Sequence, residues 1–96
     1  MIAAGAHLQD CAIGESEQLA AVAAAVQNLI LSATALGYGS IWRTGPAAKD
    51  AHVKAALGLR PRDAVVGFVY LGTPFGTPAT RPEPSLDGVV TRWTAP

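Results

Sequence analysis

The 96-residue chain has little of what most catalytic and metal-binding motifs need. It carries one cysteine, Cys11, and two histidines, His7 and His52. A single cysteine excludes an internal disulfide, and so few thiol and imidazole groups give no support for a zinc site or a Cys–His nucleophile. We therefore expect Cys11 to be a small buried apolar residue, His7 to be hydrogen-bonded at a strand end, and His52 to lie exposed on a helix.

Charge is equally scarce. Seven basic and seven acidic residues give a formal net charge of zero, which provides no electrostatic footprint for nucleic acid and no basic face for a membrane surface. The scattered carboxylates include no pair at a spacing typical of a two-carboxylate hydrolase. Residues 1–7 lack the basic and apolar regions of a signal peptide, and together with the lone cysteine this predicts a reducing, cytoplasmic setting.

A long apolar helix is the most prominent predicted element. It should run from Leu19 to Leu36, with Ser16 as its N-cap and Gly37 as its C-terminal stop. Its larger apolar residues form one stripe, namely Leu19, Val22, Val26, Leu29, Ala33 and Leu36. Its remaining surface is mostly small, with Ala21, Ala24, Ala25, Asn28 and Ala35. The helix either packs under a sheet or has one face in the core and the other in a dimer interface; its polar residues disfavour a membrane span.

Three strands are expected around this helix, at residues 2–7, 40–42 and 64–71. The last is almost continuously apolar, as at the centre of a sheet, and Gly67 within it indicates close packing of something bulky. Asp50 should cap a short helix from Ala51 to Leu57. Residues 73–84 are rich in proline and should be extended, and residues 89–93 regain strand character. We therefore divide the chain into a helix–sheet core, 1–72, and an arm, 73–96, that ends in a strand and docks on another chain.

Two motifs stand at either side of the short helix. Gly39-Ser40-Ile41-Trp42-Arg43-Thr44-Gly45 follows the long helix, and Val65-Val66-Gly67-Phe68-Val69-Tyr70-Leu71-Gly72-Thr73-Pro74 comes about 20 residues later. In this order and spacing the chain resembles the C-terminal half of the nitroreductase family, closest to the small single-domain NAD(P)H nitroreductases. The resemblance extends over residues 2–93. It implies an α+β fold with the long central helix on a mainly antiparallel sheet and an extended C-terminal arm.

The resemblance also implies a function. Family members use FMN, with NAD(P)H as reductant, to reduce nitroaromatic or quinone-like acceptors. Trp42, Arg43 and Thr44 match the segment that contributes to the FMN site. The implied partner is a second copy in a homodimer or a full-length paralogue, with the arm crossing the subunit boundary. The family's N-terminal arginine–serine segment has no counterpart in these 96 residues, and no catalytic residue is identified.

Other interpretations of the same residues stay open. Trp42 is equally suited to be a core aromatic, and Arg43 to be a surface ion-pair residue. For the whole chain, the alternative to an FMN-dependent oxidoreductase is a non-catalytic, truncated remnant that acts as a dimerisation or partner-binding module.

Overall fold

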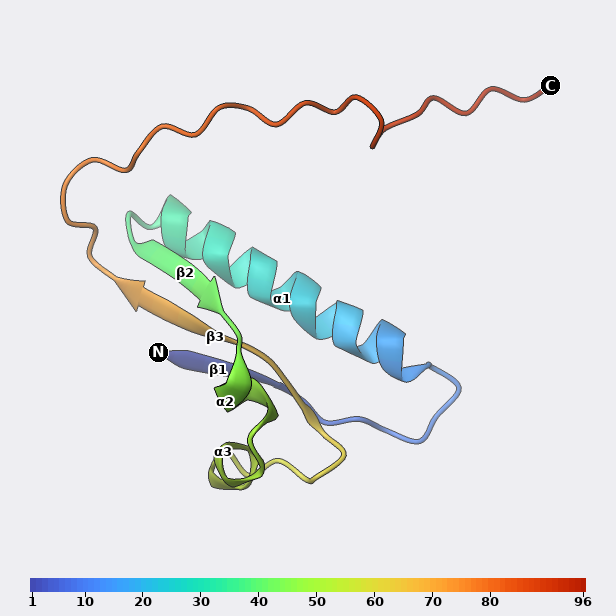
Figure 1. The fold of residues 1–96 in the computed structure, drawn as a ribbon, viewed down its shortest axis with the longest axis vertical. Helices are drawn as coiled ribbons and strands as arrows, with labels where there is room; N and C mark the ends of the chain where they lie inside the picture. Colours follow the sequence, from blue (N-terminus) through green and yellow to red (C-terminus); the bar gives the residue numbers. More distant parts are fainter.

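The computed structural model describes residues 1–96 as a three-stranded sheet with helices on both faces (Figure 1). The elements in chain order are β1 (Ile2–Ala6), α1 (Glu15–Ala35), β2 (Gly39–Arg43), α2 (Pro46–Lys49), α3 (Ala51–Ala56) and β3 (Ala64–Gly72). This arrangement confirms the predicted α+β fold with a long helix on an antiparallel sheet. The four-residue helix α2 was not predicted; Pro46 is its first residue, a position that suits the fixed φ of proline.

The sheet has the strand order β1-β3-β2, and both pairings are antiparallel. The most apolar strand, β3, therefore lies at the centre, as predicted. The pairing register shifts between Ala4 and Gly5, so that Ala4 pairs with Gly67 but Gly5 pairs with Val65. This shift leaves Val66 outside the regular pairing and allows Val65 and Phe68 to pack in the same cluster.

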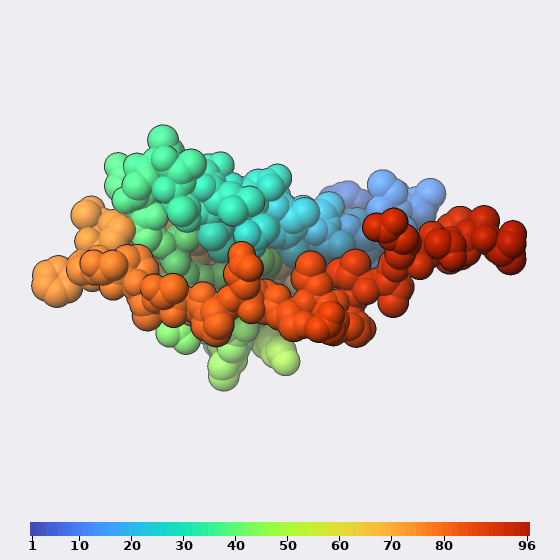
Figure 2. Space-filling view, turned by 90° about the horizontal axis from the view of Figure 1, so that it is seen from above, coloured from blue at the N-terminus to red at the C-terminus, as the bar shows by residue number.

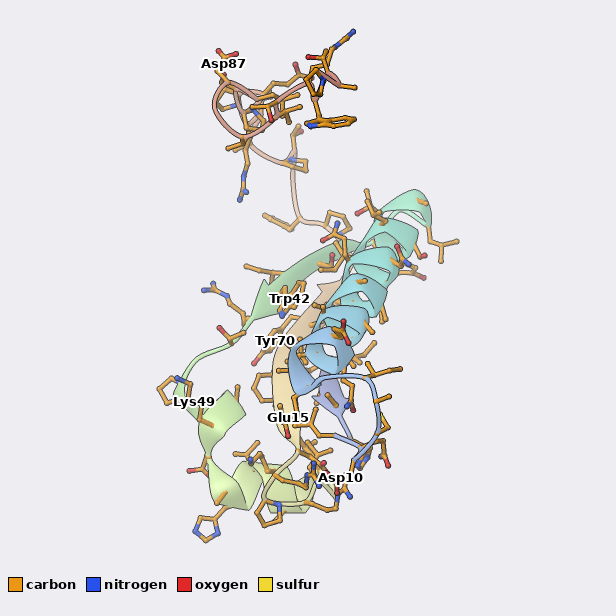
Figure 3. The ribbon with its side chains drawn as sticks, turned by 90° about the vertical axis from the view of Figure 1, so that its right-hand side faces the viewer. Asp10, Glu15, Trp42, Lys49, Tyr70 and Asp87 are labelled. Carbon is orange, nitrogen blue, oxygen red and sulfur yellow. The ribbon has the colours of Figure 1, made fainter.

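Helix α1 lies along one face of the sheet (Figures 1 and 3). The burial of its residues shows that the predicted stripe faces the sheet. Val26 and Ala33 are buried and the earlier stripe residues are half-buried, whereas Leu36 at the end is exposed. The opposite, small-residue face is exposed along its whole length. By length and composition α1 would also suit a membrane span, but the core helix of a soluble protein passes the same test.

The predicted N-cap of α1 is wrong, and the predicted C-terminal stop is confirmed. The helix begins at Glu15, and Gly14 is its N-cap. Ser16 lies inside the first turn, because the Glu17 carboxylate reaches back and accepts a hydrogen bond of 3.1 Å from the Gly14 N–H. At the other end Gly37 has φ 84°, and the Tyr38 N–H donates to the Ala33 carbonyl at 2.9 Å.

The second face of the sheet carries the small core. Ala48 of α2 packs against Val65 and Phe68 of β3. The predicted cap of α3 is confirmed, since the Asp50 carboxylate accepts hydrogen bonds from the N–H groups of His52 and Val53 at 2.8 and 3.0 Å. These two helices cover only the Phe68 end of this face, and the outer end of β2 and β3 is left bare on that side.

A buried carboxylate links the segment after β1 to the segment before β3. Asp63 is 1% exposed and accepts hydrogen bonds from the Arg60 guanidinium and from the Leu8 N–H. His7 Nδ1 lies 3.1 Å from the same carboxylate, which confirms that this histidine is satisfied at a strand end. His52 is exposed, as predicted. Cys11 is also exposed, so its predicted burial is wrong: it lies in the loop before α1, which the sheet does not cover.

Residues 73–96 form an extended, fully exposed arm (Figure 2). The arm contains no strand, so the strand predicted at residues 89–93 is absent from this single chain. A turn stands at its start, where the N–H groups of Val89 and Val90 donate to the Leu86 carbonyl. The physical reason is that an isolated strand has no partner for its backbone hydrogen bonds, and the prolines before it prevent the arm from folding back as a hairpin.

Candidate functional site

The predicted site residues lie at the end of β2 and in the turn that follows it. Trp42 pairs with Val69 of β3, and Arg43 pairs with Phe68. Because successive side chains of a strand point to opposite faces, the indole and the guanidinium are on opposite sides of the sheet. The structure therefore separates the Trp42 side chain from Arg43, and it places Arg43 and Thr44, which are adjacent in the chain, in the lining of two different depressions.

Trp42 is half-buried on the side of the sheet that faces α1 (Figure 3). Its Nε1–H donates a hydrogen bond of 3.4 Å to the Val66 carbonyl, so its one polar group is already used. The ring lies directly over Gly67, where a Cβ would be 2.5 Å from Cδ1 of the indole and closer still to Nε1. The prediction that Gly67 admits something bulky is thus confirmed, and Trp42 is the bulky group.

Arg43 is the exception among the arginines of the helix–sheet core. Arg60 pairs with Asp63 at 2.8 Å, and Arg62 pairs with Asp10 at 2.8 Å. Arg43 is exposed and pairs with no carboxylate, so the surface ion pair considered from the sequence is not formed. A guanidinium without an internal partner is free to bind an anionic ligand bidentately.

Thr44 and Gly45 lead from β2 into α2. Gly45 has φ 113°, a conformation that side-chain-bearing residues rarely adopt, and this allows the sharp turn between the strand and the helix. The turn borders an open depression of about 700 Å³. Its lining comprises Thr44, Gly45, Pro46, Ala48, Lys49, Asp50 and Val65. The depression thus combines the Thr44 hydroxyl and the Lys49 ammonium group with the Asp50 carboxylate, which caps α3.

Sequence reasoning missed Tyr70. Its ring lies on the same side of the sheet as Arg43, and the two residues line a second depression of about 370 Å³ together with Ile41. The sequence could have indicated Tyr70, because a tyrosine in an otherwise apolar central strand needs water or a protein group to hydrogen-bond its hydroxyl. The alternation of β3 was hidden by the register shift near Val66.

Asp63 and Asp10 form ion pairs with the arginines Arg60 and Arg62. The Arg60 guanidinium, by hydrogen bonding, holds the pKa of the Asp63 carboxyl well below its ordinary value of 3.8, against the opposing effect of burial. The hydrogen-bonded Arg62 likewise lowers the pKa of Asp10. No group of three or more His, Cys, Asp or Glu side chains is placed to hold a metal ion. The Arg43 guanidinium, which has no carboxylate partner, is thus suited to binding an anion.

Comparison with known proteins places this arrangement in context. The model of the Nitroreductase family matches residues 6–73. The chain is 43% identical over 58 residues to proteins named "Putative NAD(P)H nitroreductase YdjA" in Escherichia coli strains K12 and O157:H7. That match covers 60% of this chain and 32% of each relative.

The fold is also similar to a solved structure. The nitroreductase-like family protein from Bacillus cereus superposes with a TM-score of 0.77 at 22% sequence identity, over 91% of this chain and 46% of that one. The chain thus matches about a third of the length of its curated relatives and just under half of this neighbour. Since the family match runs from the end of β1 to the end of β3 and covers more than half of the chain, this chain belongs to the nitroreductase family.

Proposed function

We propose that the chain is the C-terminal, FMN-contacting part of an oxidoreductase that uses NAD(P)H to reduce nitroaromatic or quinone-like acceptors. Family membership and the name of the Escherichia coli relatives support the reaction class. The observation that carries the proposal is the exposed Arg43 guanidinium without a carboxylate partner, which precedes Thr44 in the chain and lies within the matched segment.

The donors at this turn fit the anionic end of FMN. The Arg43 fork can donate two parallel hydrogen bonds to phosphate oxygens or to a ring carbonyl, and the Thr44 hydroxyl can donate a third. Lys49 adds positive charge at the depression that Thr44 lines. The Trp42 side chain does not fit as a contact of the same ligand, since it lies on the α1 side and its N–H is taken by Val66.

The division of labour follows from these groups. FMN, when bound, supplies the hydride chemistry. Arg43 and Thr44 bind and orient the cofactor, and the rigid pairing of β2 with β3 fixes the direction in which the guanidinium points. No side chain at this surface is assigned to move a proton.

We propose a homodimer as the functional assembly. Only 10 of the 96 residues are buried, and many large apolar side chains are exposed to solvent. A second subunit could cover this apolar surface. The small-residue face of α1 would allow a second backbone to approach closely. The exposed apolar residues of the arm, among them Val89, Val90 and Trp93, would be covered by docking on the second subunit. The cytoplasm suits a chain whose only cysteine is free and exposed.

The same surfaces support a second candidate function. If the chain binds no flavin, the exposed face of α1 and the apolar arm remain, and they favour a non-catalytic module that binds a second copy or a full-length paralogue. The two functions differ in one measurable property, namely flavin affinity.

Titration of FMN with the 96-residue chain tests the proposal. Flavin fluorescence should report saturable binding, and Arg43→Ala should weaken it about tenfold or more, because a hydrogen bond to a charged group contributes about 1.5–3 kcal/mol. Arg81→Ala is the matched control, since Arg81 is an exposed, unpaired arginine of the arm. Absence of FMN binding, or equal affinity of Arg43→Ala and the parent, would remove the proposed role.

A further inference from the structure

The indole of Trp42 extends past the point where β2 and β3 stop pairing. The last pair of the two strands joins Arg43 to Phe68. Gly67 and Val66 come next along β3, and the chain after β2 turns away from them into α2. In place of backbone pairing, the ring lies over Gly67, and its Nε1–H donates a hydrogen bond of 3.4 Å to the Val66 carbonyl. A side chain thus continues the contact between the two strands at the end of β2.

The packing over Gly67 also includes the main chain of Arg43. A Cβ built at Gly67 would lie 2.5 Å from Cδ1 of the indole and 3.0 Å from the Arg43 carbonyl oxygen. Val69, which pairs with Trp42, is fully buried, so the ring lies beside a fixed part of β3. Displacement of the ring would therefore open space beside the Arg43 carbonyl and loosen the end of β2.

Arg43 has few other contacts that could fix its direction. It is the last residue of β2, which is an edge strand, and its exposed side chain has no carboxylate partner. Two residues later the chain bends at Gly45, where φ is 113°. Segments with few buried contacts open readily, and a bidentate guanidinium contact depends on the direction of the fork. The direction of Arg43 therefore depends on what anchors the residue before it.

We propose that Trp42 is a positioning residue for the ligand contact of Arg43, and that it acts through the main chain without touching the ligand. The inference rests on the proposed function and adds the residue that holds Arg43 in place. Alternation along β2 puts the indole on the α1 side and the guanidinium on the other side of the sheet. By anchoring the end of the strand before the ligand arrives, Trp42 reduces the ordering that binding would otherwise require.

A double-mutant cycle of Trp42→Phe with Arg43→Ala tests this role, because it measures whether two residues act through one another. Trp42→Phe keeps an aromatic ring over Gly67 but removes the N–H donor. Trp93→Phe is the matched control, since Trp93 is 82% exposed in the arm. FMN affinity is measured by flavin fluorescence for the parent, both single variants, the double variant and the control, with circular dichroism as the check on folding.

We expect Trp42→Phe to weaken FMN binding about fivefold in the parent, which corresponds to the loss of one hydrogen bond. This loss must stay below that of Arg43→Ala, because a positioning residue cannot remove more than the contact it positions. In the Arg43→Ala background, Trp42→Phe should leave the affinity unchanged, and Trp93→Phe should have no effect. Without flavin, ¹⁵N relaxation should give a lower order parameter for the Arg43 amide in Trp42→Phe than in the parent.

Several outcomes would overturn the inference. An equal loss of affinity in both backgrounds would show that Trp42 contacts the ligand directly, and a less stable Trp42→Phe chain with full affinity would leave Trp42 only a structural role. The proposed function would survive both results, whereas a parent that binds no FMN would remove the two together.

NOE contacts from the Trp42 indole protons to the Gly67 Hα protons of the parent decide the matter if Trp42→Phe fails to fold. They should be present without FMN and persist when it is added; their absence, or their loss on adding FMN, would contradict the positioning role.

Discussion

Gly67→Ala should destabilise the chain because the space above Gly67 is filled by Trp42. An added Cβ would lie 2.5 Å from the indole Cδ1, closer still to Nε1, and 3.0 Å from the Arg43 carbonyl oxygen. The indole is not a flexible chain end, and the carbonyl belongs to the paired backbone of β2. Relief of the overlap would therefore require both the ring and the strand to move.

The expected size of this effect follows from three contributions. Overpacking of this kind costs about 1–3 kcal/mol. Displacement of the ring also loses the hydrogen bond from Trp42 to the Val66 carbonyl, a contribution of about 1 kcal/mol. Replacing a glycine inside a strand offsets part of this, by about 0.5–1 kcal/mol. We expect a net loss of about 2 kcal/mol, which lowers the melting temperature of a chain of this size by roughly 10 °C.

Thermal unfolding followed by far-UV circular dichroism measures this loss. Gly72→Ala is the matched control, because Gly72 lies in the same strand and an added Cβ there would meet no atom within 4 Å. The control should be as stable as the parent or slightly more stable. A Gly67→Ala chain that melts with the parent would refute the packing of Trp42 over β3.

Three further predictions concern the buried Asp63 carboxylate, helix α1 and the arm. Since the pKa of Asp63 is depressed, its stabilising effect is present above the ordinary value of 3.8 and is lost as the pH falls below it; Asp63→Asn should show a shallower acid dependence in urea unfolding. Ala24→Leu, on the exposed face of α1, should leave monomer stability within about 0.5 kcal/mol but weaken dimerisation by about 1–3 kcal/mol in sedimentation equilibrium. A chain truncated after Thr73 should be less dimeric than the parent at matched concentration by light scattering; equal dimerisation would exclude the arm as a clasp.

The sequence predicted those parts of the fold that depend on local pattern. The stripe on α1, the cap at Asp50 and the central place of β3 each follow from residue spacing or capping chemistry. The bulky neighbour of Gly67 was also foreseen, but its identity was not. Strand register decides that Trp42 and not another side chain lies over Gly67, and register depends on the pairing of distant segments.

The candidate site was less accessible to sequence reasoning for the same reason. Trp42, Arg43 and Thr44 are adjacent in the chain, yet alternation along β2 separates the first from the second. Tyr70 joins Arg43 only through the antiparallel pairing of β2 with β3, which a single sequence does not reveal. The predicted burial of Cys11 and the predicted strand at residues 89–93 are both wrong. No other segment of this chain packs over Cys11, and none pairs with residues 89–93.

The most direct test of the central claim is to map FMN on the chain by amide chemical-shift perturbation in ¹H–¹⁵N NMR spectra. We predict that the largest changes fall on Arg43 and Thr44, and that they saturate with added FMN. Changes confined to α1 or to the arm, or no changes at saturating FMN, would contradict the assignment of the turn after β2 as the flavin site.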